Sequence, residues 1–455
     1  MKKRANFNSK LGIVLASAGS AVGLGNVWRF PTEVGTGGGA AFILVYVLCV
    51  VVLGLPLMVS EFIIGRHTHK NTADAYRQLA PRSGWILQGY LGVFTAWFIL
   101  CYYGVVAGWT MKYLVEALVG GLGNITDSAA YFTSFSGAVW EPLIYMLVVM
   151  LMCHIVIYRG VQAGIERSSK LMMPMLLLII AMLVVFSFSM PGSREGLRFL
   201  LYPDFSKLTS SVVLSAMGQA FFSLSLAMGC LCTYASYFTD DAKLIKTAGS
   251  VALIDTIVAI MSGFIIFPAV FSVEAVAPDA GPGLVFITLP HVFKIAFGGL
   301  PLLGWFFSVM FYLLLLLAAL TSMFSLHEPP TAFLIEHFNI SRRSATAVVT
   351  LVCVAVGVLC SLSFGVLADF KGLFGLTFFD FFDFVSAKIF LPVGGIIISI
   401  FVGWRLDREI IVAQLTNHGS LRVPSWLISA FVFLLRWIIP LAVGGIFIKE
   451  LGLIG

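Results

Sequence analysis

The chain has 455 residues, of which 59% are hydrophobic and 11% are charged, and its mean hydropathy is +1.00. These values exclude a soluble globular domain, in which about 25% of residues are charged. The composition predicts an all-α polytopic membrane protein. The formal net charge of +6 does not require a nucleic-acid partner, because the topology of the chain explains most of it.

In chain order, the sequence contains eleven apolar stretches. Each is long enough to cross about 30 Å of hydrocarbon at about 1.5 Å per residue. We therefore expect eleven transmembrane helices. They span residues 11–36, 40–65, 86–119, 141–158, 168–190, 211–238, 247–275, 303–335, 344–363, 376–403 and 426–448.

The distribution of Lys and Arg predicts the orientation. If the N-terminus is inside, 18 of the 28 basic residues fall in cytoplasmic segments, 7 outside and 3 within spans. Because cytoplasmic loops carry an excess of Lys and Arg, this bias favours a cytoplasmic N-terminus. With an odd number of spans, the C-terminus is expected outside the cell, and the protein is expected in the cell membrane. All seven cysteines lie within apolar spans, which favours packing over disulfide formation.

Two spans contain helix-breaking sequences. The first contains "GSAVGLGNVWRFP" (residues 19–31), with three glycines in seven residues, followed by Asn26 and Arg29. The sixth contains "FFSLSLAMG" (residues 221–229). Non-helical backbone at membrane depth is tolerated where it lines a cavity enclosed by protein. Two interrupted spans at matching places in two five-helix halves are typical of inverted-repeat transporters. The alternative is two kinked helices, since glycine is common in membrane helices.

The motifs "GSAVGLGNVWRFP", "GQAFFSLSLAMG", "TYASYF" and "AALTS" together resemble the neurotransmitter:sodium symporter family, especially its bacterial amino-acid transporters. The resemblance extends from Arg4 to the eleventh span. It implies one transmembrane transporter domain, 1–455, with a 5+5 inverted-repeat (leucine-transporter-like) fold and interrupted helices 1 and 6. The repeats would cover 11–190 and 211–403, with helix 11 at 426–448. Most family members have twelve spans, so the missing span leaves oligomeric contacts in doubt, and we expect a monomer or weak dimer.

The resemblance implies two co-transported Na⁺ ions and no organic cofactor. Na⁺ prefers hard oxygen ligands, and carbonyls released from helix hydrogen bonds supply them. The implied first site comprises Ala21, Asn26, Ser223 and Asp255, completed by the carboxylate of the substrate. The implied second site comprises the carbonyls of Gly19, Val22 and Ala318 and the hydroxyls of Thr321 and Ser322. Alone, "AALTS" is a weak signal, because Thr and Ser often bond back to their own helix.

Gly23 indicates the substrate class. Monoamine transporters of the family have an aspartate in the corresponding motif, "AVDLGN", whereas this chain has "AVGLGN". The substrate is therefore expected to bring its own carboxylate, held by the Tyr103 hydroxyl and the Gly25 N–H. Ala227 replaces a common glycine, and its methyl could narrow the pocket. The implied substrate site comprises Ala21, Leu24, Gly25, Ile99, Tyr103, Phe222, Ser223, Ser225, Met228, Ser322 and Leu326.

Charged residues on both sides of this site are interpreted as gates. The implied outer gate pairs Arg29 with Asp383 through water, above Tyr103 and Phe222. The alternative is a permanent structural ion pair. The implied inner gate comprises Arg4, Ser236, Tyr237 and Glu336. In span 5, Gly164 and Pro174 fit a family pattern, and because both weaken a helix, its cytoplasmic half could unwind. A static kink is the alternative.

Asp255 departs from the familiar pattern, which has asparagine at this position. Chloride-dependent relatives bind the anion near positions matched by Tyr46, Gln219 and Ser223. Other chloride-independent relatives place an acid where this chain has Ala259. Asp255 is therefore expected to replace chloride. When sodium and substrate leave, an unpaired buried carboxylate favours protonation, which predicts proton counter-transport by Asp255. The alternative is a ligand that remains ionised.

The sequence thus predicts Na⁺-coupled uptake of neutral hydrophobic, aliphatic and aromatic L-amino acids by alternating access. A channel would need a continuous polar stripe, whereas the polar residues here cluster at two breaks. An intramembrane enzyme would need a nucleophile and base or a metal site, and neither H-E-x-x-H nor G-x-S-x-G is present. A sensor that binds the same ligands without transporting them stays open.

Overall fold

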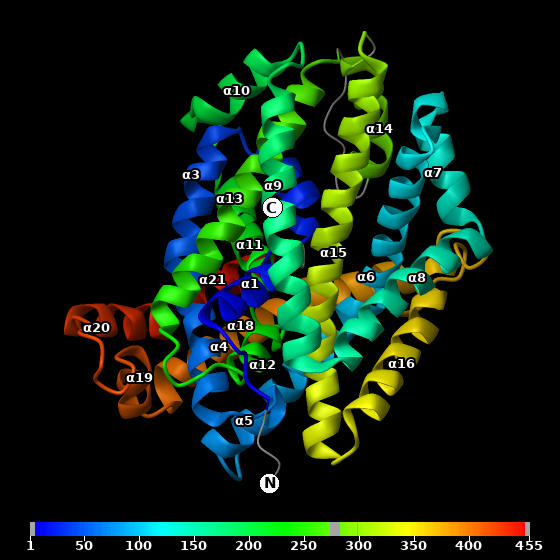
Figure 1. Ribbon diagram of the computed structural model, residues 1–455. Helices are drawn as coiled ribbons and strands as arrows, with labels where there is room; N and C mark the ends of the chain where they lie inside the picture. The colour runs from blue at the N-terminus through cyan, green and yellow to red at the C-terminus, as the bar shows by residue number, and fades with distance from the viewer. Residues whose placement is uncertain (1–4, 274–282, 298, 451–455) are drawn as a thin grey trace.

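The computed structural model describes residues 5–273, 283–297 and 299–450, and all regular structure in these ranges is helical (Figure 1). The α-helices of the first half are α1 Lys10–Ala21, α2 Phe30–Thr36, α3 Ala40–Cys49, α4 Leu55–Thr68, α5 Thr72–Leu79, α6 Ile86–Leu118, α7 Ser128–Gly137, α8 Trp140–Tyr158, α9 Arg167–Ser187 and α10 Ser193–Leu201. The second half contains α11 Ser210–Ser223, α12 Cys230–Ala235, α13 Leu244–Val270, α14 Leu289–Ala296, α15 Pro301–His337, α16 Arg342–Leu362, α17 Phe378–Asp383, α18 Leu391–Ile400, α19 Arg408–Leu415, α20 Ser425–Phe433 and α21 Ile439–Glu450.

Short π-helical segments join several of these helices into longer spans. They are η1 Gly25–Arg29, η2 Val50–Gly54, η4 Val161–Glu166, η6 Leu284–Thr288, η8 Phe384–Phe390, η9 Phe401–Arg405 and η10 Leu434–Ile438. The 3₁₀ turns η3 Gly121–Asn124, η5 Phe205–Lys207 and η7 Leu373–Gly375 lie in the connections.

Within the described ranges, nine helices are long and apolar enough to cross a membrane. They are Ala40–Thr68, Ile86–Leu118, Trp140–Tyr158, Val161–Ser187, Leu244–Val270, Pro301–His337, Arg342–Leu362, Phe378–Arg405 and Ser425–Lys449. A tenth candidate is the broken pair Lys10–Ala21 and Gly25–Thr36, bent by 56°. The expected sixth span, 211–238, consists of α11 and α12 with a break between them, and each is too short to span alone. The count of eleven stays a prediction.

Helix α15 is the central element of the bundle. It has 37 residues and packs along α6 and against α1, α9 and α16. In Figure 1 it runs through the height of the molecule, with the N-terminus and α5 at one end and α10 and α14 at the other. We call the end that carries residues 5–9 and α5 the N-terminal side. All seven cysteines are buried and free, as their positions predicted.

Both predicted helix breaks are present. After α1, Val22 is extended (φ −68°, ψ 111°), which ends the helix before η1 resumes it in another direction. Between α11 and α12, the φ angles of Ser225, Ala227 and Gly229 are 51°, 63° and 69°. Positive φ is incompatible with a continuing right-handed helix. These residues therefore turn the chain within the membrane-embedded bundle.

Glu61 of α4 holds the second break in place. Its Oε1 accepts a hydrogen bond from the Ala227 N–H at 2.6 Å, and its Oε2 accepts one from the Cys232 N–H at 3.2 Å. The Glu61 side chain is 1% exposed. In hydrocarbon these N–H groups have no water to bond, so the carboxyl group supplies partners that the broken helix lacks.

Replacing Glu61 with Ala should lower the free energy of unfolding by roughly 3 kcal/mol, because two buried N–H groups lose their acceptors. Glu61→Gln retains one acceptor oxygen, so its free energy of unfolding should lie between those of the wild type and of Glu61→Ala. Thermal unfolding of the purified protein in detergent measures the effect. Ser60→Ala is the matched control. Ser60 is equally buried, but its one hydrogen bond within the described ranges goes to the Pro56 carbonyl of its own helix, at 2.7 Å. Equal effects of Glu61→Ala and Ser60→Ala would contradict this role.

Candidate functional site

The two breaks meet at a cavity of about 40 Å³ between α1, α6, α11 and α15. All eleven residues of the expected substrate site line it: Ala21, Leu24, Gly25, Ile99, Tyr103, Phe222, Ser223, Ser225, Met228, Ser322 and Leu326. Ser20, Gly23, Asn26 and Ser325 complete the lining. The motif positions are thus brought together from segments that are far apart in the sequence.

Asn26 and Ser223 line this cavity, and together with Asp255, which lies behind them, they form a polar cluster. The Asn26 Nδ2 donates to Asp255 Oδ1 at 2.7 Å, and the Ser223 hydroxyl donates to Asp255 Oδ2 at 2.7 Å. The Tyr46 hydroxyl lies 3.4 Å from Asp255 Oδ2, and Asn26 Oδ1 accepts from the Gly23 N–H at 2.9 Å. The exposed fractions of Asn26, Ser223 and Asp255 are 0%, 2% and 0%. The cluster therefore joins the first break to the second and to α13.

The Asp255 carboxyl group has only neutral donors around it. Within the described residues, no Lys, Arg or His nitrogen lies within 4.0 Å of its oxygens. A buried carboxylate without an opposite charge is costly, so such a group needs a cation or a proton. The described chain contains no group of three or more His, Cys, Asp or Glu that could hold a metal ion. The chemistry here is that of one carboxyl group surrounded by neutral oxygen and nitrogen atoms.

The residues expected at the second ion site also lie together, where α1 meets α15. The Ser322 hydroxyl donates to the Val22 carbonyl at 3.2 Å. The Thr321 hydroxyl bonds back to the carbonyls of Leu317 and Ala318 at 3.0 and 3.1 Å, as Thr commonly does within a helix. A Cβ atom on Gly19 would lie 3.2 Å from the Thr321 Cβ, so the two helices approach closely here.

Tyr103 and Gly23 define the part of the cavity nearest the first break. The Tyr103 hydroxyl accepts a hydrogen bond from the Leu24 N–H at 3.2 Å. A Cβ atom on Gly23 would lie 2.7 Å from the Ser322 Oγ and 3.3 Å from the Tyr103 hydroxyl oxygen. The site therefore has no room for an acidic side chain at position 23 in this arrangement.

The second break contacts the first through Ser225, whose hydroxyl donates to the Ser20 carbonyl at 2.7 Å. Ala227 lies outside the cavity lining. A Cβ atom on Gly394 would lie 3.1 Å from the Ala227 Cβ, which shows that this methyl is directed toward α18. The expectation that the Ala227 methyl narrows the pocket is wrong for this reason.

On the side away from the N-terminus, Arg29 covers Phe222. The Arg29 Cζ lies 4.7 Å from the centroid of the Phe222 ring, and its Nε lies 3.9 Å from Glu33 Oε1. Glu33 in turn accepts from the Ser215 hydroxyl at 2.6 Å. No direct ion pair of Arg29 with Asp383 within 4.0 Å is present in the described part of the chain, and the expected water-mediated pair stays a prediction.

On the N-terminal side, Phe7 packs into the bundle. The Phe7 N–H donates to the Tyr237 carbonyl at 2.9 Å, and the Phe7 side chain is 1% exposed. Lys10 forms an ion pair with Asp241 at 2.8 Å, and this interaction lowers the pKa of Asp241. The Ser236 hydroxyl donates to the Thr233 carbonyl at 2.5 Å.

The expected pair of Arg4 with Glu336 lies outside the described residues, because Arg4 precedes them. Glu336 Oε2 accepts from the backbone and side-chain nitrogens of Asn71 at 2.7 and 2.9 Å. The Tyr237 hydroxyl donates to Glu328 Oε1 at 2.7 Å. The structure therefore adds Glu328 to the residues expected at the inner end.

Arg342 was not among the predicted site residues. Its guanidinium donates to both carboxylate oxygens of Glu328, at 2.9 and 2.5 Å, and this pair lies directly beside Tyr237. The signal that could have identified the pair is an acid inside an apolar span followed by an arginine where the next span begins.

Span 5 is helical from Val161 to Ser187, including Gly164 and Pro174. Glu166 lies within the predicted unwinding segment, and its carboxylate accepts from the Asn8 N–H at 2.8 Å and the Ser9 hydroxyl at 3.1 Å. The helical form of this segment is thus linked to the residues that precede α1. Its unwinding stays a prediction.

The comparisons with known proteins agree with this geometry. The family model described as "Sodium:neurotransmitter symporter family" matches residues 4–134 and 128–451. An uncharacterized sodium-dependent transporter of Bacillus subtilis (strain 168) is 40% identical in sequence to this chain. The alignment covers 100% of this chain and 99% of the relative. The sodium- and chloride-dependent GABA transporter 2 of Mus musculus is 26% identical in sequence, and the alignment covers 85% of this chain and 70% of the relative.

Among solved structures, MhsT in complex with L-phenylalanine superposes with a TM-score of 0.88. It is 39% identical in sequence, and the match covers 98% of this chain and 100% of that chain. The all-helical architecture with interrupted first and sixth spans is therefore the leucine-transporter-like fold that the motifs implied. The matches cover nearly the whole chain, and the protein belongs to the sodium:neurotransmitter symporter family of membrane transporters.

Proposed function

We propose that this protein is a Na⁺-coupled symporter that takes up neutral hydrophobic L-amino acids by alternating access. The observation that carries the proposal is the buried Asp255 carboxyl group. Among the described residues it has only neutral donors, and it bonds to Asn26 of the first break and to Ser223 beside the second. A cation at this position supplies the missing opposite charge. The sodium-dependent relatives support Na⁺ as that cation.

We assign two ions and one substrate to the groups around the cavity. The first Na⁺ binds Ala21, Asn26, Ser223 and Asp255, and the substrate carboxylate completes its shell. The second binds the carbonyls of Gly19, Val22 and Ala318 and the hydroxyls of Thr321 and Ser322. Because the substrate carboxylate is itself a ligand of the first ion, each increases the affinity for the other.

The cavity favours an amino acid over a decarboxylated amine. The absence of a carboxylate at Gly23 leaves the substrate to provide one. We assign Tyr103 and Gly25, which both line the cavity, to bind it. Ile99, Met228 and Leu326 form an apolar side-chain pocket, which suits aliphatic and aromatic groups. The L-phenylalanine complex of the structural relative supports this assignment.

Alternating access requires the contacts on each side of the cavity to open in turn. Toward the outside, Arg29 moves off Phe222 and pairs with Asp383 as the gate closes. Toward the inside, the Arg4–Glu336 pair, Ser236 and Tyr237 separate, and span 5 unwinds between Gly164 and Pro174. The repeats 11–190 and 211–403 move relative to each other, with the N-terminus in the cytoplasm, the C-terminus outside, and the protein acting as a monomer or weak dimer.

Sodium-dependent binding of L-phenylalanine tests this assignment. The purified protein should bind labelled L-phenylalanine in NaCl and lose most of this binding in an equal concentration of KCl. Thr321→Val combined with Ser322→Ala removes the two hydroxyl ligands of the second ion and should lower the apparent Na⁺ affinity about tenfold or more. Equilibrium dialysis at increasing Na⁺ concentrations measures both effects.

Ser308→Ala is a matched control, since its hydroxyl bonds only within α15, to the Gly304 carbonyl at 2.8 Å, and lies outside the cavity lining. It should leave the Na⁺ titration unchanged. An unchanged titration in the Thr321/Ser322 double variant would contradict the second ion site. Binding that is equal in NaCl and KCl would contradict sodium coupling altogether.

Asp255 further predicts chloride-independent uptake with a proton carried back. Because the carboxylate supplies the negative charge beside the first ion, wild-type uptake should be the same in chloride and in gluconate. On the empty return step the carboxyl group takes a proton, so an outward proton gradient should accelerate uptake. Proteoliposome uptake in both anions, with and without this gradient, is the measurement.

Asp255→Asn should make uptake respond to chloride or abolish it, and any remaining uptake should no longer respond to the proton gradient. Gln219→Ala is a useful comparison, since the Gln219 Nε2 lies 3.5 Å from the Gly25 carbonyl but the side chain carries no charge. It should not create chloride dependence. A chloride requirement in the wild type would show that Asp255 does not replace the anion.

A further inference from the structure

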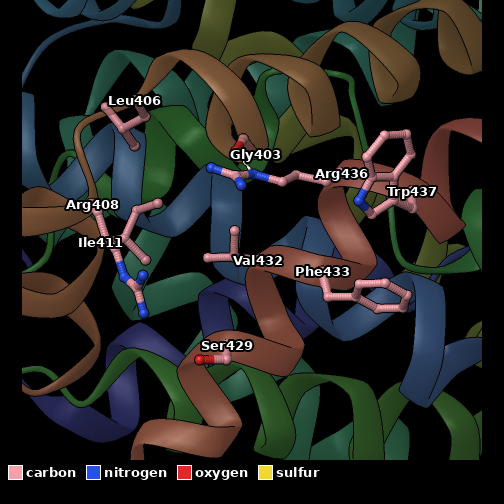
Figure 2. A pocket seen from close by; sticks show the side chains of 9 residues that line it. All are labelled: Gly403, Leu406, Arg408, Ile411, Ser429, Val432, Phe433, Arg436 and Trp437. Carbon is pink, nitrogen blue, oxygen red and sulfur yellow. Dashed lines mark hydrogen bonds between the residues drawn. The ribbon is translucent and has the colours of Figure 1, made fainter.

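A second cavity, of about 250 Å³, lies away from the substrate site, between the end of span 10, α19 and span 11 (Figure 2). Two arginines line it, Arg408 of α19 and Arg436 of η10. None of the nine lining residues is acidic, although Asp407 and Glu409 flank Arg408 in the sequence. The cavity is therefore electropositive.

The Arg436 guanidinium is held in position by two contacts, but most of its N–H groups have no hydrogen-bond acceptor among the described residues. Its Nε donates to the Gly403 carbonyl at 2.5 Å, and its Cζ lies 5.1 Å from the centroid of the Trp404 ring. Figure 2 shows the side chain extended toward Gly403. Its remaining N–H groups have no hydrogen-bond acceptor among the described residues, and no carboxylate in the described ranges lies within 4.0 Å of Arg408 or Arg436.

One face of span 11 provides the other wall. The lining residues Ser429, Val432, Phe433, Arg436 and Trp437 recur at the spacing of a single helical stripe. Phe433 and Trp437 are 54% and 51% exposed. Only 28% of the most apolar part of this span is buried, less than in any of the other candidate spans in the described ranges. The stripe thus combines an apolar surface with one cationic group, Arg436, near the middle of the span.

The cavity lies toward the N-terminal side of the bundle. Arg66, near the end of α4, donates to the Gln414 side chain and carbonyl at 2.7 and 2.8 Å and to the Ala242 carbonyl, which fixes α19 beside the segment after α12. In Figure 1, α19 and α20 lie at the edge of the bundle. An arginine on the lipid-facing surface of a span needs an anionic partner. At this place the surrounding lipid can supply one.

We propose that this cavity binds the phosphate of an anionic phospholipid, with Arg408 and Arg436 as the cationic ligands, Ser429 as a hydroxyl donor, and the acyl chains along Phe433 and Trp437. Arginine is suited to this role because its planar guanidinium donates two parallel hydrogen bonds to a phosphate. Basic pockets between transmembrane helices near a membrane surface are known to recognise anionic headgroups. The proposal is independent of the transported substrate.

Lipid titration of the delipidated full chain in detergent, followed by native mass spectrometry, tests the proposal. Dioleoyl-phosphatidylglycerol should bind about tenfold or more tightly than dioleoyl-phosphatidylcholine. Arg408→Gln combined with Arg436→Gln should remove this preference. Arg405→Gln combined with Arg422→Gln is the control, because Arg405 ends span 10, Arg422 lies in the connection that follows, and both are exposed but do not line the cavity. The control should retain the preference.

Ser429→Glu provides a second test that leaves both arginines in place. It adds a carboxylate to the exposed wall of the cavity and should also abolish the preference for phosphatidylglycerol. A preference that survives both cavity variants, or is lost equally in the Arg405/Arg422 control, would overturn the proposal. Displacement of bound phosphatidylglycerol by an equal concentration of inorganic phosphate would overturn a lipid as the ligand and indicate a soluble anion.

Discussion

Inside a bilayer, every backbone N–H and C=O must find its partner within the protein. The two helix breaks meet this requirement with side chains from several other elements. At the first break, the Tyr103 hydroxyl and the Asn26 side chain accept hydrogen bonds from backbone N–H groups. The hydroxyls of Ser225 and Ser322 donate to the carbonyls at the end of α1 and at Val22. At the second break, Glu61 accepts from two backbone N–H groups. Ser225 belongs to the second break and bonds to the end of α1, so this hydrogen bond links the two breaks directly. The cavity exists where these contacts converge.

The same arrangement places one carboxyl group in an otherwise neutral environment. Asp255 bonds to Asn26 of the first break and to Ser223 at the end of α11, so a cation held there would join three elements. In the proposed mechanism the substrate carboxylate also binds that cation, so the binding of the ion and the binding of the substrate are thermodynamically coupled. At the N-terminal side, the Glu328–Arg342 pair and the contacts of Glu166 with Asn8 and Ser9 connect spans 4, 5, 8 and 9 to the segment before α1. Movement at the cavity can therefore be communicated to that end through packed, bonded elements.

The sequence was sufficient to predict the interrupted helices, because glycines and polar residues at membrane depth have few physical explanations. The residues that line the cavity were predicted from the resemblance to the symporter family. It did not predict every acid that an arginine contacts. The Arg29 Nε lies 3.9 Å from Glu33 Oε1, one turn along the chain, and this contact was not predicted, whereas the water-mediated pair of Arg29 with Asp383 stays a prediction. The Glu328–Arg342 pair and the role of Glu61 depend on helix packing, which spacing along the chain does not report. The direction of the Ala227 methyl likewise depends on a positive φ angle that a residue type alone does not reveal.

The most direct test of the account is gradient-driven uptake of labelled L-phenylalanine by the purified protein in proteoliposomes. With an inward Na⁺ gradient, the protein should accumulate the amino acid above its external concentration, and collapse of the gradient with a sodium ionophore should release it. Sodium-dependent binding without accumulation would contradict symport and identify a sensor. Flux that only equilibrates the amino acid, with or without a Na⁺ gradient, would contradict ion coupling and identify a passive pathway.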